Sequence, residues 1–209
     1  LIRTMKLENG LFEQCRGFFE LKDEIVDEDG EIVPKDTQTV KQADVIMLLY
    51  LLPGLCTREE LRKNWDYYEP RTTHSSSLSF GVHGIIAAEL GLADKARYYI
   101  DKSLGIELYD EMGNASEGIH MAANGMSWSA IVNGYAGARP INGKFRIEPR
   151  LPSHWKKLQF TLKWKGADFT VVIDGSSITV TNKPSAKASL PLVVKCKEYS
   201  VRPGETVCI

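Results

Sequence analysis

Three segments of this chain gather side chains that could bind a sugar or an anion. The first, residues 41–44, opens a very apolar stretch. Its lysine supplies ammonium donors, and its glutamine supplies both a donor and an acceptor. Lys41 and Gln42 could therefore hold sugar hydroxyls or a negatively charged group. The structural alternative is a solvated first helical turn, in which Asp44 serves the helix dipole.

The second segment, residues 65–79, is rich in aromatic, acidic and hydroxyl side chains. Flat aromatic faces beside carboxylates such as Glu69 suit a pyranose ring and its hydroxyls. His74 and the serines Ser76 and Ser77 could donate hydrogen bonds to a phosphate just ahead of a helix. The structural alternative is a loop with one N-capping serine, which explains a single serine but not their concentration.

The third segment, residues 117–128, contains Gly125, whose backbone could approach a ligand closely and offer its amide to an anion. The alternative is helix packing against the small residue. The sequence has no G-x-x-x-x-G-K phosphate motif, and its histidines lack the spacing of metal ligands. We therefore predict no metal site.

Helical patterns must position these three segments. Thr57 and Glu60 form the capping box that opens one helix, and Gly91 and Gly105 are expected to end two others. The near absence of polar side chains in 45–52 indicates a helix with neighbours on most sides. The predicted helices span residues 39–52, 57–68, 77–90, 93–103 and 120–132.

The pattern changes from helical to alternating after Pro140. An apolar side chain at every second position from Leu158 to Trp164 predicts a strand with one buried face. Asp174-Gly175 predicts a turn between two further strands. The predicted strands span residues 158–164, 169–173, 177–181, 190–194 and 206–209. We expect an α+β chain with a helical domain at 1–140 and a β domain at 141–209.

Composition narrows the class of protein. The 209 residues are 43% hydrophobic with a net charge of -1, but residues 141–209 carry 12 Lys and Arg against 5 Asp and Glu. Because these cations are dispersed, we expect no nucleic-acid partner. The longest apolar run, 45–52, is too short for a bilayer, so no membrane partner is expected.

Four scattered cysteines without a C-x-x-C pair favour reduced thiols and a cytoplasmic protein. A start at Leu1 suggests missing upstream sequence.

Several motifs occur together in an order typical of one enzyme family. The chain resembles the C-terminal part of glycoside hydrolase family 65, which contains the maltose, kojibiose and trehalose phosphorylases. The resemblance covers nearly the whole chain and rests on Gly10–Gln14, Gly17–Leu21, Lys41–Asp44, Thr73–Ser79, Gly118–His120 and Leu151–Trp155. It implies the closing helices of an (α/α)6 barrel followed by a small antiparallel β-sandwich.

The resemblance also implies an activity. Family members cleave α-glucosides with inversion: inorganic phosphate attacks the anomeric carbon while a glutamic acid protonates the departing oxygen, and β-glucose 1-phosphate forms. The implied partners are an α-linked glucose disaccharide and phosphate as co-substrate, with no cofactor, and a homodimer is common. The family's general acid lies upstream of these residues, so we assign no catalytic residue and expect this fragment alone to be inactive.

Family motifs imply roles for seven residues of this chain. They assign glucose binding to Lys41, Gln42 and Glu69, and phosphate binding to His74, Ser76, Ser77 and Gly125. One departure is Met126, which stands where phosphorylases usually have a second glycine and could reshape the phosphate loop. A family hydrolase that uses water is therefore the alternative.

A further alternative comes from a different class, a non-catalytic carbohydrate-binding or structural module built on the β domain. It would require exposed aromatics among Trp155, Phe160, Trp164 and Tyr199.

Overall fold

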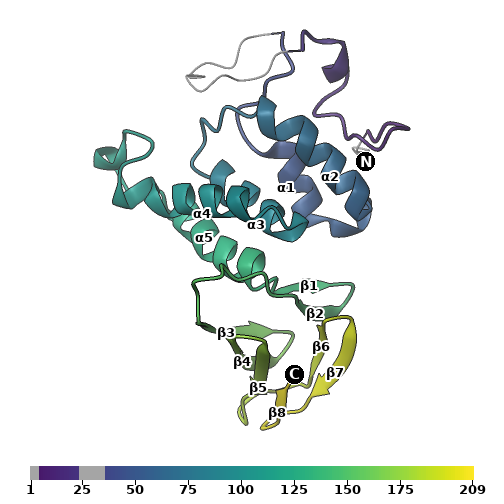
Figure 1. Cartoon of the computed structure of the whole chain (residues 1–209), viewed down its shortest axis with the longest axis vertical. Coiled ribbons are helices and arrows are strands. Elements are labelled where there is room, and N and C mark those ends of the chain that lie inside the picture. The colour runs from purple at the N-terminus through teal and green to yellow at the C-terminus, as the bar shows by residue number, and fades with distance from the viewer. Residues whose placement is uncertain (1–4, 24–35) are drawn as a thin grey trace. The chain divides into compact units, whose positions relative to one another are not determined.

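The computed structural model describes residues 5–23 and 36–209 as two compact units, one over residues 1–130 and one over residues 131–209. The helical unit contains five α-helices within the described residues (Figure 1). They are α1 (Asp44–Leu51), α2 (Arg58–Tyr68), α3 (Ser79–Leu90), α4 (Ala93–Leu108) and α5 (Met121–Ser129).

Helix α2 begins where the capping motif predicts. The Glu60 amide donates to the Thr57 hydroxyl at 3.2 Å, and the Thr57 amide donates to a Glu60 carboxylate oxygen at 2.9 Å. Such a reciprocal pair satisfies two amides that have no partner inside the helix. The helix ends at Tyr68, and a 3₁₀ turn over Glu69–Arg71 follows it.

Helix α3 is the centre of the helical unit and packs against α1, α4 and α5. Nine of its twelve residues are buried, and its apolar side chains point in all directions. Two glycines allow close approach of its neighbours: a Cβ on Gly81 would lie 2.3 Å from Met126 Cγ, and one on Gly84 would lie 2.6 Å from Ile100 Cγ1. The backbone of α3 therefore lies unusually near α5 and α4.

The predicted end of the fourth helix is wrong. Helix α4 does not stop before Gly105 but continues to Leu108, with Gly105 and Ile106 both buried inside it. A glycine in a helix interior costs about 1 kcal/mol relative to alanine. Burial of an isoleucine side chain contributes about 1.5–3 kcal/mol, so packing outweighs the local preference.

The chain leaves the helical unit through α5, which runs from Met121 and is followed by a π-helical segment over Ala130–Tyr135. The predicted helix over 120–132 thus exists, but it changes type at its C-terminal end. None of the helices in the described part of the chain is long and apolar enough to cross a membrane.

The β unit consists of two four-stranded sheets, and the expected α+β order of helices followed by an antiparallel β-sandwich is confirmed. One sheet has the strand order β1-β2-β6-β7 and the other β3-β4-β5-β8. The strands are β1 (Arg139–Ile141), β2 (Lys144–Ile147), β3 (Lys157–Trp164), β4 (Ala167–Asp174), β5 (Ser177–Asn182), β6 (Leu190–Val194), β7 (Lys197–Val201) and β8 (Thr206–Cys208). Between neighbouring strands, only β2 and β6 pair in parallel. The predicted domain boundary at 140 and 141 stays a prediction.

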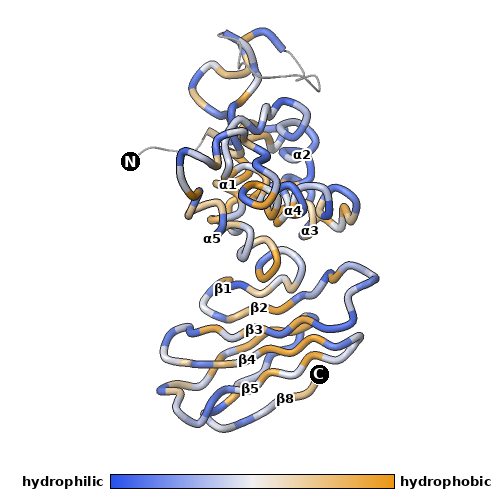
Figure 2. Tube along the Cα trace, turned by 90° about the vertical axis from the view of Figure 1, so that its left-hand side faces the viewer, coloured by the Kyte–Doolittle hydropathy of each residue, from blue (hydrophilic) through white to orange (hydrophobic). Residues whose placement is uncertain are grey.

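Alternation in β3 to β5 builds the sandwich core. Phe160 is buried, and Leu158, Leu162 and Trp164 are partly buried on the same face of β3. Figure 2 shows hydrophobic and hydrophilic stretches alternating along these strands. Asp174 pairs with Ser177, so Gly175 lies in a two-residue turn with a φ of 58°, a value that glycine adopts readily.

Candidate functional site

Two loops of the helical unit run side by side and bring the first two candidate segments together. Val40 and Thr72 form a parallel bridge. The Val40 amide donates to the Arg71 carbonyl at 2.8 Å, and the Thr73 amide donates to the Val40 carbonyl at 2.9 Å. The residues that follow each bridge position, Lys41 and His74 among them, therefore emerge from adjacent backbones.

Lys41 and Gln42 lie at the surface just ahead of α1. The Gln42 amide group donates to Asp44 Oδ1 at 2.9 Å, and that of Gln14 donates to Asp44 Oδ2 at 2.6 Å. Asp44 is in the first turn of α1, as its dipole role requires, and it also orients Gln42. Gln14 thus ties the N-terminal motif to this part of the helical unit.

Asn64 organises the segment around Gln14, a role that its position within α2 did not reveal. It is fully buried; its side chain accepts from the Phe12 amide at 2.9 Å and donates to the carbonyls of Gly10 and Glu60 at 2.9 and 2.8 Å. The Tyr68 hydroxyl also donates to the Phe12 carbonyl, at 2.5 Å.

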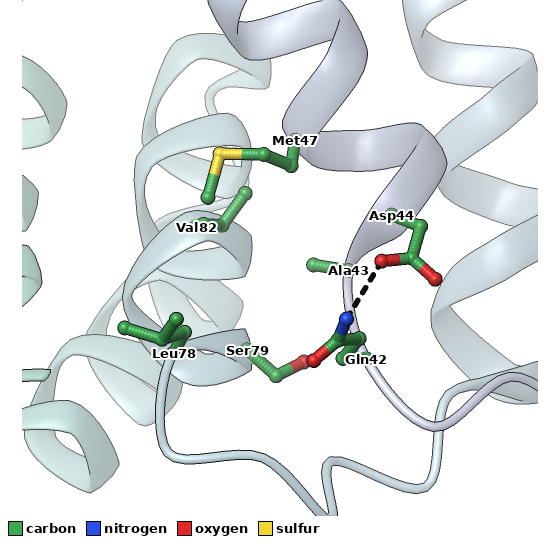
Figure 3. Close-up of a pocket in the computed structure, with 7 residues that line it drawn as sticks. All are labelled: Gln42, Ala43, Asp44, Met47, Leu78, Ser79 and Val82. Carbon is green, nitrogen blue, oxygen red and sulfur yellow. Dashed lines mark hydrogen bonds between the residues drawn. The ribbon is translucent and has the colours of Figure 1, made fainter. Parts of the chain in front are cut away.

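A pocket of about 120 Å³ lies between the start of α1 and the start of α3 (Figure 3). Polar Gln42 and Ser79 stand at one end, and Met47 and Val82 at the other. The lining residues are Gln42, Ala43, Asp44, Met47, Leu78, Ser79 and Val82. The pocket thus offers a few polar groups at the edge of an apolar wall, as ligand sites commonly do.

His74 is held in an unusual backbone conformation, with a φ of 54°. Its Nδ1 lies 2.8 Å from the Ser79 hydroxyl, and its ring stacks on Phe80 at 5.1 Å between centroids. Burial, assisted by neighbouring His83, lowers the pKa of His74 to about 3. The imidazole is therefore neutral near pH 7.

The other ring nitrogen of His74, Nε2, is buried and has no partner among the described residues. A neutral imidazole has one donor and one acceptor nitrogen. When the Ser79 hydroxyl donates to Nδ1, the proton must reside on Nε2. In that tautomer His74 can donate a hydrogen bond to an anionic oxygen.

His83, one turn into α3, is completely buried beside His74, with 4.5 Å between the ring centroids. Its Nδ1 donates to the Ser79 carbonyl at 3.0 Å, which leaves Nε2 as an acceptor without a partner in the described residues. Burial lowers the pKa of His83 to about 4. Its neutral ring packs against both Trp65 and Tyr99, with 5.4 and 5.1 Å between ring centroids.

Ser76 and Ser77 are half-buried just before α3. Helix α3 has Leu78 at its N-cap and no side-chain cap, so the alternative of an N-capping serine finds no support in residues 72–90. The Ser76 carbonyl accepts from the Ser79 amide at 3.0 Å. In the described part of the chain neither the Ser76 nor the Ser77 hydroxyl is engaged, so both are available to a ligand.

Glu69 lies in the 3₁₀ turn after α2 and is held from α4. Its Oε1 accepts from Lys95 Nζ at 2.6 Å and from the Tyr99 hydroxyl at 2.7 Å. The ring of Tyr99 also packs near an imidazole, with its centroid 5.0 Å from that of His74. Glu69 and His74 are therefore linked through a single tyrosine.

Gly125 lies inside α5, is exposed, and would have open space around an added Cβ. The alternative of helix packing at this glycine is therefore not supported. Packing occurs one residue later, where Met126 lies against Gly81 and its Cβ would come within 3.2 Å of a Cβ there. The side chain of Met126 thus points toward α3, the helix that follows the His74 loop.

None of the four candidate aromatics of the β unit is fully exposed, since Trp155, Trp164 and Tyr199 are half-buried. Trp155 packs on Tyr135 with 5.4 Å between centroids, and Trp164 packs near Phe145 at 5.8 Å. Phe160 is buried. The described residues also contain no cluster of side chains that could hold a metal ion.

Comparison with known proteins finds relatives of this chain among disaccharide phosphorylases. The chain is 41% identical over 154 residues to the kojibiose phosphorylase of Halothermothrix orenii, covering 74% of this chain and 20% of that protein. It is 43% identical over 127 residues to the α,α-trehalose phosphorylase of Thermoanaerobacter brockii, covering 61% and 16%. The maltose phosphorylase of Bacillus subtilis is 38% identical over 135 residues, covering 65% and 18%. The chain thus spans about a fifth of the length of these relatives.

A solved structure from the human microbiome, assigned provisionally as a kojibiose phosphorylase, matches 99% of this chain and 29% of its own with a TM-score of 0.85 and 31% identity. The model of the glycosyl hydrolase family 65 central catalytic domain matches residues 4–129, and that of the family's C-terminal domain matches residues 138–201. The helices are thus the C-terminal portion of the family's helical barrel, followed by its β-sandwich. The chain belongs to glycosyl hydrolase family 65.

Proposed function

We propose that the protein carrying this chain is an inverting α-glucoside phosphorylase. It converts an α-linked glucose disaccharide and inorganic phosphate into β-glucose 1-phosphate and an acceptor sugar. The observation that carries the proposal is the half-buried, neutral His74, whose buried Nε2 has no partner in the described residues, beside the unengaged hydroxyls of Ser76 and Ser77. When the proton is on Nε2, these three groups are donors without bonds and suit a tetrahedral oxyanion.

In this proposal, side chains from the two adjoining loops bind the two substrates. Lys41, Gln42 and Glu69 bind the glucose unit through its hydroxyls. His74, Ser76 and Ser77 bind phosphate, and Gly125 borders it. The phosphate oxygen attacks the anomeric carbon, the bond to the leaving oxygen breaks, and that oxygen takes a proton from a general acid. Because phosphate is already a nucleophile, no second carboxylate has to activate it.

We also propose that the general acid is a glutamate outside these 209 residues, since no family motif assigns that role to a carboxylate of this chain. The 209-residue chain by itself is then expected to release no glucose 1-phosphate from any disaccharide. Release by the purified chain alone would contradict this part of the proposal.

The test is the phosphate dependence of the reaction. The full-length protein is incubated with maltose, kojibiose or trehalose, the substrates named in its relatives. Products are followed by ¹H NMR, which distinguishes the anomers. We expect β-glucose 1-phosphate to appear only when phosphate is present. Glucose release at the same rate with and without phosphate would indicate a family hydrolase. Formation of α-glucose 1-phosphate would exclude inversion.

A further inference from the structure

Two side chains of α4 hold the Glu69 carboxylate by the same oxygen. Lys95 Nζ and the Tyr99 hydroxyl lie 2.6 and 2.7 Å from Oε1. Hydrogen bonds to a charged group are stronger than those between neutral groups. Since both donors use Oε1, they fix the orientation of the carboxylate while Oε2 takes part in neither bond and can accept from a sugar hydroxyl.

Tyr99 touches the phosphate side of the site as well. Its ring centroid lies 5.0 Å from that of His74 and 5.1 Å from that of His83, and only 4% of the residue is exposed. Burial and the nearby Glu69 carboxylate raise the pKa of the Tyr99 phenol, so the hydroxyl remains protonated and continues to donate.

We propose that Tyr99 and Lys95 are positioning residues of this site: their hydrogen bonds orient Glu69 toward glucose, and the ring of Tyr99 supports His74 toward phosphate. This inference rests on the proposed function, which supplies the roles of Glu69 and His74. Neither positioning residue contacts a substrate. Tyr99 therefore makes two separable contributions, one through its hydroxyl and one through its ring.

The two contributions can be separated by measuring the KM values for disaccharide and for phosphate in the full-length protein. Tyr99→Phe removes the hydroxyl and keeps the ring, so we expect the disaccharide KM to rise about tenfold and the phosphate KM to stay within about twofold. Tyr99→Leu also removes the ring, and both KM values are expected to rise.

Lys95 provides an independent test at a half-exposed position, where a substitution does not disturb the core. Lys95→Met is expected to raise the disaccharide KM about threefold to tenfold. Lys95→Arg keeps the cation, so its disaccharide KM is expected to stay close to that of the unmodified protein. Matched controls on the same helix are Tyr98→Phe, at an exposed neighbouring tyrosine, and Lys102→Met, which breaks an ion pair with Glu111 instead. Neither control should change either KM.

Several results would overturn the inference: an unchanged disaccharide KM in Tyr99→Phe, an equal rise of both KM values in that variant, or the same change in the controls. If Tyr99→Phe fails to fold in a thermal unfolding assay, Lys95→Met and Lys95→Arg decide the matter. If the protein instead hydrolyses the disaccharide, the proposed function fails. The disaccharide KM of hydrolysis then still reports whether Tyr99 and Lys95 position Glu69.

Discussion

Two imidazoles that the fold keeps neutral, His74 and His83, make the stability of the helical unit sensitive to acid. Their pKa values fall to about 3 and about 4 through burial, whereas an unfolded histidine titrates near 6.5. Below pH 6.5 the unfolded chain therefore binds protons that the folded chain does not. The two histidines therefore do not lower the free energy of unfolding above pH 6.5. They lower it progressively as the pH falls from 6.5 toward their pKa values in the folded chain.

We accordingly predict that the free energy of unfolding decreases by up to about 1.4 kcal/mol per pH unit for each histidine between pH 6.5 and 5. Urea unfolding of the protein across this range measures the slope. His83→Gln should reduce the slope, while His154→Gln, at an exposed position in the β unit, should not. An equal slope in all three proteins would contradict the prediction.

The sequence points to candidate ligand-binding residues in loops but not to the residues that contact them in the folded structure. Lys41, Gln42 and His74 are conspicuous because polar side chains cluster around them. Tyr99 and His83 stand in helical patterns whose apolar positions predict only burial. Their roles depend on which helices become neighbours, a property of tertiary packing that no local spacing encodes.

At the scale of elements, helix α3, which follows the His74 loop, packs against α5, the helix that contains Gly125. Gly81→Ala would place a methyl group 2.3 Å from Met126 Cγ and 3.1 Å from the Ser103 hydroxyl. We predict that this variant lowers the free energy of unfolding by about 1–3 kcal/mol. Gly54→Ala, where an added Cβ meets nothing within 4 Å, is the matched control.

The cause of the loss can be checked by adding Met126→Ala to Gly81→Ala. If overpacking is responsible, shortening the methionine should recover part of the stability, and a double-mutant cycle in chemical unfolding measures the coupling. Additive losses in the double variant would mean that the two side chains do not share this space.

Helix boundaries were predictable where a local signal sets them, whereas the first helix begins at Asp44 and not at the predicted residue 39. The capping box at Thr57 depends on residues within one turn, and it is confirmed. The end of α4 was predicted wrongly, because Gly105 does not adopt the left-handed conformation that ends a helix and is buried inside α4. Strands β1, β2 and β7 were not predicted. In β7, three of the five residues are exposed, so hydrophobic alternation is weak.

At the scale of the whole molecule, the β unit has its own core. Its buried cluster lies entirely between Val132 and Val201 and includes Phe145, Phe169 and Leu192. Domains of about 60 residues can fold alone when their apolar surface is sufficiently buried. We predict that a fragment of residues 131–209 folds cooperatively, with one urea transition and a near-ultraviolet circular dichroism signal from its tryptophans. A broad transition with dye-accessible apolar surface would contradict this.

The parallel pairing of β2 with β6 sets an order of events during synthesis. Phe145 pairs with Leu192, and Thr181 with Thr206, so each sheet is completed by a strand from near the end of the unit. The β1–β2 hairpin and the β3–β5 meander can form early from local contacts, but both keep an unpaired edge until β6 and β8 have left the ribosome. Long-range pairings of this kind slow folding because loop-closure entropy is lost before the contacts form. The apolar faces of the two sheets are thus incompletely covered, and open to misassociation, until β6, β7 and β8 are made.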